Sequence, residues 1–226
     1  MKRVLMPVTA TILALTVAAN AAPKRGDTSV EILGGWAMED GVEPDDYTSV
    51  RDDAIAGGDL DGWLLAGGIS WFTSDRLQIG IAAMTTSLEA DNVTGAVDFE
   101  ELGIIFPDAF PYDVDSEVSL YGAGGRARWY LNEMGKLQPY IGIQGFWVTG
   151  DVEISGVSTS EFDPGAISAS EDTDGLLWAP LLGATVELSA SNKILIEYQY
   201  HMWEGDVGDV LDSGHAITVG FAHTLK

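Results

Sequence analysis

The chain has 226 residues, a formal net charge of −24 at pH 7 and no cysteine. With 11 basic residues against 35 acidic ones, it lacks the basic patch that nucleic-acid binding and docking on an anionic membrane surface require. The missing cysteines exclude disulfides and thiolate metal sites, which is compatible with export from the cytoplasm.

The first 21 residues are predicted to be a cleaved signal peptide. Lys2 and Arg3 form the positive start, residues 4–18 are apolar, and Ala19-Asn20-Ala21 is a small-x-small cleavage site. The apolar stretch is too short for a transmembrane helix. We therefore expect residues 22–226 to form one exported domain.

Eight segments of the remaining chain alternate between apolar and polar side chains. The alternation is clear near residues 77–82, 121–131, 194–202 and 216–225, and weaker over roughly 28–38, 60–73, 137–150 and 175–189. A period of two favours strands over helices. Two prolines oppose strand pairing, because proline has no N–H to donate. Pro139 can begin its strand, whereas Pro180 requires a bulge or a local break.

Short and long connections alternate between these segments. Short polar turns fall at Thr73–Arg76, Asn132–Lys136 and Ser189–Lys193. Long connections fall at about 39–59, 89–116, 151–174 and 204–213. This pattern is typical of bacterial outer-membrane barrels, which have short periplasmic turns and long extracellular loops.

Six of the seven tryptophans share the apolar face and lie near strand ends. Four are predicted at the outer rim and two at the inner rim, as two aromatic girdles: Trp36, Trp63, Trp147 and Trp178, and Trp71 and Trp129. In a soluble barrel, the alternative, this face would point inward. An eight-stranded interior is too narrow for six tryptophans. We therefore predict an all-β fold, an eight-stranded antiparallel transmembrane β-barrel.

Two stretches resemble small outer-membrane barrels of the OmpA-like, OmpW-like and opacity-protein group. They are RARWYLNEMGKLQPYIGIQG (126–145) and ILIEYQYHMWEGD followed by HAITVGFAHTL. The resemblance implies the outer membrane of a Gram-negative bacterium, with the lipid bilayer, lipopolysaccharide and the barrel-assembly machinery as partners. Members of the group usually end in an aromatic residue. Here the nearest aromatic to the end is Phe221, so we expect a weaker or shifted assembly signal.

The lumen face is predicted to hold ion pairs. Its candidate members are Glu31, Arg126, Arg128, Glu187 and Glu197, together with Gln144 and Gln199. An unpaired charge in a narrow lumen is costly, so arginine–carboxylate pairs are expected. Two interpretations stay open: a structural plug, or a gate that opens a narrow pore when pairs exchange.

Acidic residues are concentrated in the first outer connection and also occur in the last. They are Glu39, Asp40, Glu43, Asp45, Asp46, Asp52, Asp53 and Asp59, relieved by Arg51, and then Asp206, Asp209 and Asp212. We expect a solvated acidic surface. The alternative is that divalent cations bridge these carboxylates to lipopolysaccharide. Asp59-Leu60-Asp61-Gly62 lacks the remaining ligands of a calcium loop, and no metal or cofactor is expected.

Histidine could indicate an enzyme, since some barrel lipid A deacylases and phospholipases use a Ser–His–acid arrangement. His201 is predicted on the lumen face with Glu197 four residues away, whereas His215 and His223 have the opposite parity. The His-x-Ser spacing of the deacylases is absent, because Trp203 occupies that position. We therefore expect a structural rim histidine.

The second long connection holds an aromatic group: Phe106, Phe110 and Tyr112, with Pro107 and Pro111. It could contact a partner or pack on itself over the barrel mouth. The leading functional hypothesis is a non-enzymatic, monomeric envelope-structural or surface-interaction protein. The alternatives are a narrow channel for small or apolar solutes and, less favoured, a lipid-modifying enzyme.

Overall fold

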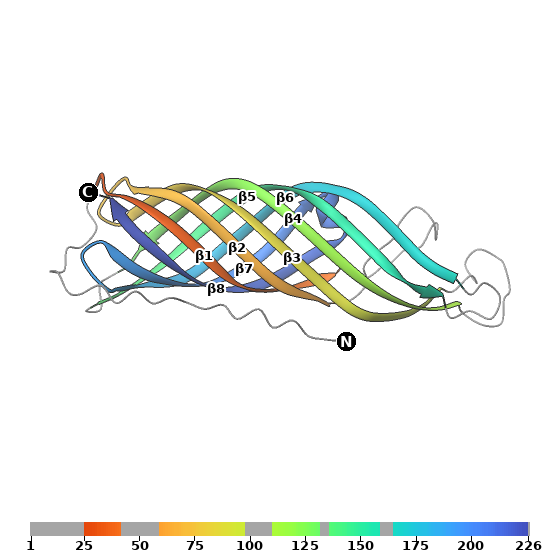
Figure 1. Cartoon of the computed structure of the whole chain (residues 1–226). Coiled ribbons are helices and arrows are strands. Elements are labelled where there is room, and N and C mark those ends of the chain that lie inside the picture. The colour runs from red at the N-terminus through yellow and green to blue at the C-terminus, as the bar shows by residue number, and fades with distance from the viewer. Residues whose placement is uncertain (1–24, 42–58, 98–109, 132–135, 159–164, 226) are drawn as a thin grey trace.

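Eight antiparallel strands close into a barrel in the computed structural model, which describes residues 25–41, 59–97, 110–131, 136–158 and 165–225 (Figure 1). The strands are β1 (Thr28–Gly41), β2 (Asp59–Phe72), β3 (Leu77–Val97), β4 (Phe110–Tyr130), β5 (Leu137–Ser158), β6 (Gly165–Glu187), β7 (Asn192–Gly205) and β8 (Leu211–Leu225). Each strand pairs with the next, and β8 pairs back onto β1. The predicted fold class is therefore confirmed. The predicted signal peptide lies outside the described residues.

Side chains alternate between the inside and the outside of the closed sheet. Along β7, Glu197, Gln199 and His201 are buried inside, whereas Tyr198 and Tyr200 are exposed outside. The same alternation leaves large apolar side chains exposed on every strand, such as Ile32, Leu65, Ile81, Tyr121, Ile143, Leu182, Ile196 and Ile217. A bilayer requires an apolar outer face and backbone groups that are all paired internally. A closed sheet with an apolar outer face meets both requirements. None of the described residues belongs to a helix long and apolar enough to span a membrane.

Two of the short turns at one end are built on serine. In the β2–β3 turn, Ser74 Oγ accepts the backbone N–H of Leu77 at 3.0 Å. In the β7 entry turn, Ser189 Oγ accepts the N–H of Asn192 at 3.1 Å. These side chains satisfy backbone donors that the strands leave unpaired.

Strands β3 to β6 are longer than the sequence pattern predicted. The connections expected at 89–116 and 151–174 are largely strand, and β3 and β4 remain paired up to Val97 and Phe110. We name the outer parts of β3 to β6 the protruding sheet (Figure 1). It comprises residues 90–97, 110–116, 149–158 and 165–174. Outside a bilayer both faces of a strand can be polar, so the apolar alternation disappears while the backbone ladder continues. Phe110, Pro111 and Tyr112 begin β4, whereas Phe106 and Pro107 lie outside the described residues.

Both prolines occupy places that tolerate the missing N–H. Pro139 is the third residue of β5, near the strand start. At Pro180 the β6–β7 ladder passes from Trp178–Met202 to Leu181–Gln199 with no pair between them. The local break expected at Pro180 is therefore confirmed.

Candidate functional site

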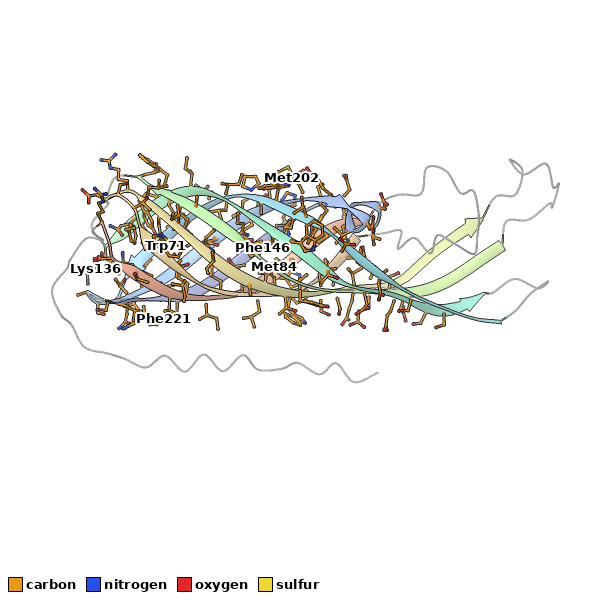
Figure 2. The ribbon with its side chains drawn as sticks, turned by 90° about the horizontal axis from the view of Figure 1, so that it is seen from above. Trp71, Met84, Lys136, Phe146, Met202 and Phe221 are labelled. Atoms are coloured by element: carbon orange, nitrogen blue, oxygen red, sulfur yellow. The ribbon has the colours of Figure 1, made fainter. Side chains whose placement is uncertain are left out.

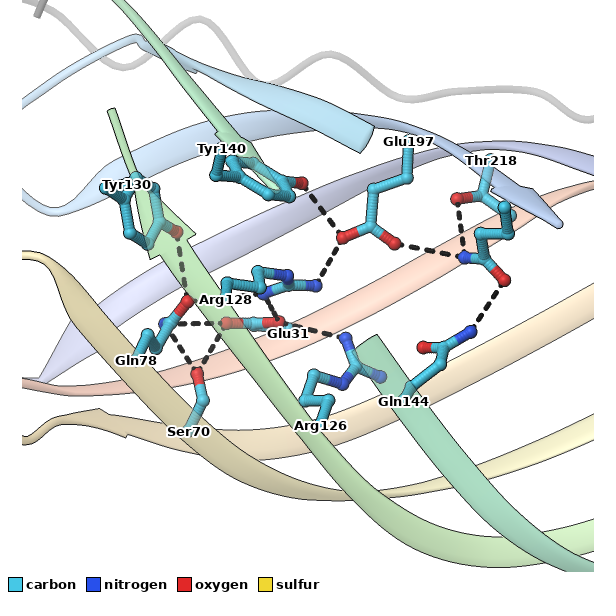
Figure 3. Close-up of polar contacts among 11 residues, drawn as sticks. Glu31, Ser70, Gln78, Arg126, Arg128, Tyr130, Tyr140, Gln144, Glu197 and Thr218 are labelled. Atoms are coloured by element: carbon cyan, nitrogen blue, oxygen red, sulfur yellow. Dashed lines mark hydrogen bonds and ion pairs between the residues drawn. The ribbon is translucent and has the colours of Figure 1, made fainter. Parts of the chain in front are cut away.

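Four charged side chains from three strands meet in the middle of the lumen. Arg128 of β4 lies between the carboxylates of Glu31 on β1 and Glu197 on β7, at 2.6 and 2.5 Å. Arg126, two residues before it, approaches Glu31 at 3.2 Å (Figure 3). All four side chains are buried. Two arginines facing two carboxylates leave this cluster neutral overall.

Neutral polar groups complete the bonding of the two carboxylates. Glu31 accepts hydrogen bonds from Ser70 at 2.5 Å and from Gln78 at 3.0 Å. Glu197 accepts from the Tyr140 hydroxyl at 2.9 Å and from Gln199 at 3.0 Å. Buried charges are tolerated when pairing and hydrogen bonding are this complete.

The two arginines differ in how firmly they are held. Arg128 contacts both carboxylates, and its guanidinium also lies 5.3 Å from the ring centre of Tyr140. Arg126 uses one nitrogen for Glu31, while its Nε and Nη2 atoms are buried without a hydrogen-bond partner among the described residues. Arg128 leaves only its Nε without a partner there, so Arg126 is the less fully bonded of the two.

The remaining ion-pair candidate, Glu187, does not join this cluster. Its carboxylate lies 4.0 Å from Nζ of Lys193, near the inner end of the barrel, and not beside an arginine. Glu187 is near the end of β6, too far along the barrel to reach the arginines of β4. Gln144 and Gln199 do meet in the lumen, at 2.7 Å.

A second buried polar cluster was missed by the sequence analysis. Glu39, expected in the acidic first connection, lies inside the barrel near the end of β1 and is 1% exposed. It contacts His201 and accepts the indole N–H of Trp203. Extending the inward parity of Glu31 along β1 reaches Glu39, and that signal could have identified it. His201 faces the lumen as predicted, but its carboxylate partner is Glu39, not Glu197.

Apolar side chains close the lumen on both sides of the charged cluster. The larger group fills the outer half and includes Leu60, Leu64, Leu88, Val118, Leu120, Phe146, Val148, Leu177, Trp203, Val207 and Leu211. Val207 belongs to η2 (Asp206–Asp209), the turn between β7 and β8. Toward the inner end, Phe72, Tyr130, Tyr140 and Leu181 pack together. We name the larger group the apolar seal.

Exposed tryptophans lie at two levels of the outer face. All six girdle candidates are exposed, Trp147 most of all at 57%. Trp36 and Trp63 are directly paired across β1 and β2, whereas Trp71 and Trp129 lie near the inner strand ends. Figure 2 shows Trp71 at the same end as Lys136, away from the protruding strands. His215 is also outside, beside Tyr198, and exposed His223 bonds Asn192.

Exposed basic residues and most exposed acidic residues lie at opposite ends of the barrel. Every lysine and arginine of the described residues lies either inside the lumen or, as Arg25, Arg76 and Lys136 do, at the inner end. Exposed acidic residues gather above the outer tryptophans on all eight strands and η2: Asp40, Asp61, Glu89, Asp115, Glu117, Asp151, Glu153, Asp172, Glu204, Asp206, Asp209 and Asp212. Asp59 begins β2, and the other acidic residues predicted for the first connection lie outside the described residues.

Four of these carboxylates form a ladder of like charge. Asp61, Glu89, Glu117 and Glu153 occupy directly paired positions on β2, β3, β4 and β5. One row away, Asp151 pairs with Asp172, and a hydrogen bond between their side chains raises the pKa of Asp151 above its ordinary value. Like charges on paired positions repel. Within the described residues, no three potential ligands are grouped as a metal site.

No protein-family model and no curated protein sequence matches the chain. Among solved structures it is similar to Neisserial surface protein A, NspA, with a TM-score of 0.52 and 12% identity over 88% of this chain and 97% of that one. Ail of Yersinia pestis aligns with a TM-score of 0.45 and 12% identity over 89% and 100%. OprG of Pseudomonas aeruginosa aligns with a TM-score of 0.37 and 14% identity over 90% and 98%. The chain thus has the fold of small eight-stranded outer-membrane barrels.

Proposed function

We propose that this chain is a non-enzymatic outer-membrane protein whose closed barrel anchors the protruding sheet as an acidic contact surface outside the cell. The lipid bilayer is its first partner, since apolar side chains cover the outer wall between the two tryptophan levels. The serine turns and the exposed basic residues then lie at the periplasmic end. The acidic residues lie at the outer leaflet.

The observation that best supports a surface role is the protruding sheet itself. Residues 90–97 of β3 pair only with β4, and residues 165–174 of β6 pair only with β5, within the described part of the chain. A membrane anchor alone needs no strand beyond the outer tryptophans. The outward side at the base of this extension bears Glu89, Glu117 and Glu153 in a paired row, which favours cationic partners.

Peptide binding tests this role. The probe is a fluorescent peptide of alternating lysine and valine, and the readout is anisotropy with the refolded protein in micelles. We expect binding that weakens with salt and falls at least several-fold when Glu89, Glu117 and Glu153 become glutamine. The matched control neutralises Asp206, Asp209 and Asp212, which lie at the same end but around η2. Equal loss in both variants would contradict a specific role for the sheet.

A narrow channel for small or apolar solutes is the second candidate. The free N–H groups of Arg126 favour it, because they allow the arginine to exchange carboxylates. The apolar seal opposes it, because water and ions do not pass a packed apolar layer. Single-channel recording in a planar bilayer decides the matter. We expect no conductance steps from the wild type or from Arg126→Ala, and discrete steps would favour the channel.

A lipid-modifying enzyme is not the function we propose. Both ring nitrogens of His201 already contact Glu39 and Gln199, and no serine or threonine hydroxyl bonds this histidine among the described residues. A Ser–His–acid mechanism requires a hydroxyl within hydrogen-bond reach of the imidazole. Lipid turnover that disappears in His201→Ala would contradict the proposal.

A further inference from the structure

A histidine–carboxylate pair lies inside the apolar outer half of the barrel. His201 and Glu39 are 0% and 1% exposed, and Nδ1 of His201 lies 2.5 Å from Oε1 of Glu39. The other oxygen of Glu39 accepts the indole N–H of Trp203 at 2.9 Å. The proposed surface contact makes no use of this pair.

Hydrogen-bond polarity requires a proton between His201 and Glu39. The carboxylate of Glu197 only accepts, so the Gln199 amide nitrogen 3.0 Å away must donate to it. The amide oxygen of Gln199 therefore faces Gln144 Nε2 at 2.7 Å and His201 Nε2 at 3.3 Å. Nε2 of His201 therefore donates to Gln199, and the contact between Nδ1 and the Glu39 carboxyl requires one further proton, which either partner can carry.

Charge balance in the lumen requires the same proton. The two arginines of the central cluster offset its two carboxylates, and Lys193 offsets Glu187. This leaves Glu39, whose one cationic neighbour among the described residues is His201. Around the pair, β5 presents neutral Gln144, while β6 and β8 present apolar residues and glycine: Leu177, Ala179, Gly214 and Ala216. Without the proton, Glu39 would be an uncompensated charge in an apolar surrounding, which is costly.

The pair also holds β7 opposite a gap in the β6–β7 ladder. At Pro180 the β6–β7 ladder has no pair between Trp178–Met202 and Leu181–Gln199, which is the stretch opposite His201. The His201–Glu39 contact ties β7 to β1 across the intervening β8. Directly beyond it lie Trp203 and Val207, members of the apolar seal. Loss of the contact would therefore release the strand end that closes the mouth.

We propose that His201 and Glu39 form a proton-operated latch on the outer mouth of the barrel. With the proton in place, β7 and η2 stay packed on the apolar seal. When the proton leaves, Glu39 is uncompensated, and the segment from Met202 to Leu211 opens more often. A rise in pH therefore loosens the mouth while the barrel wall in the bilayer remains intact.

Hydrogen exchange of the refolded protein tests the latch. The readout is the protection factor of residues 202–211, which corrects for the base catalysis of chemical exchange. We expect protection to fall as pH rises, by at most about tenfold per pH unit, the limit for release of one proton. The double variant His201→Gln with Glu39→Gln removes both titratable groups of the pair and should have pH-independent protection. His223→Gln, at the exposed inner-end histidine, should keep the wild-type profile.

Two results would overturn the latch. One is wild-type protection that does not change with pH. The other is a pH dependence that persists in the double variant. If the double variant does not fold, Glu39→Gln replaces it, because without the carboxylate no charge is left uncompensated when the proton leaves. A persistent dependence in that variant would likewise reject the proposal.

Discussion

Arg128 and Glu31 meet at 2.6 Å in the middle of the lumen, although 97 residues separate them in the chain. Strands β1 and β4 are not neighbours in the sheet, so this contact crosses the interior and joins opposite parts of the wall. Together with Glu197 it ties three strands at one level. Arg126 pairs with Glu31 alone, so the two arginines should not be equivalent.

Arg128→Ala should destabilise the barrel more than Arg126→Ala. Removing Arg128 leaves two buried carboxylates without their main partner, a loss of about 3–5 kcal/mol. Arg126 has one such contact and two N–H groups without a partner among the described residues. Urea unfolding from lipid vesicles measures the difference, with exposed Lys136→Ala as the control. Equal losses for the two arginines would contradict the assignment.

Neutralising the carboxylate ladder should stabilise the protruding sheet. Glu117 lies between Glu89 and Glu153, so Glu117→Gln removes repulsion on both sides, at about 0.2–1 kcal/mol per pair. Thermal unfolding should show a higher Tm at low salt, and the gain should shrink as salt screens the wild type. Asp75→Asn, in an inner turn, is the control.

Magnesium tests whether cations only screen the carboxylate ladder or bridge it to lipopolysaccharide. If screening alone acts, magnesium and sodium chloride at equal ionic strength raise the Tm of the wild type equally. A larger effect of magnesium that disappears in Glu117→Gln would instead support the alternative, a cation bridge to lipopolysaccharide. Added lipopolysaccharide should then enlarge the effect.

The Asp151–Asp172 pair should make the outer β5–β6 contact more stable in mild acid. The pKa of Asp151 is raised above 3.8 in the folded protein, chiefly by the hydrogen bond with Asp172. The stabilisation from this pair is complete below the pKa of Asp151 in the unfolded chain and is lost as pH rises through its higher pKa in the folded protein. A carboxylate paired with a cation behaves in the opposite way. Hydrogen exchange of this segment should show the trend, and Asp172→Asn should abolish it.

Two glycines of the barrel wall should respond oppositely to alanine. A Cβ at Gly124 would lie 1.9 Å from the carbonyl oxygen of Gly145, so backbone must move, at a cost of about 1–3 kcal/mol. At Gly34 the nearest atom would be 3.7 Å away. Gly34→Ala should therefore be neutral or stabilising by up to about 1 kcal/mol. Unfolding midpoints compare the two, and a stable Gly124→Ala would show that the wall is more loosely packed.

Most of the barrel could be read from alternation, because a bilayer imposes one apolar face on every spanning strand. Ile194 to Met202 shows this clearly, and Pro180 correctly indicated a broken ladder. The sequence pattern did not predict the outer parts of β3 to β6, because a strand in water can be polar on both faces. Glu39 was misplaced for a related reason, since a carboxylate near a strand end is more often solvated than buried.

The sequence by itself determined the strand number, the orientation of the tryptophans and which residues face the lumen, since each follows from a period of two. It also placed Arg126, Arg128, Glu31 and Glu197 on the same interior face. Only the tertiary structure decided that Arg128 lies between two carboxylates and that His201 meets Glu39. Those contacts depend on the stagger of strands that are not neighbours, and closure of the barrel sets that stagger.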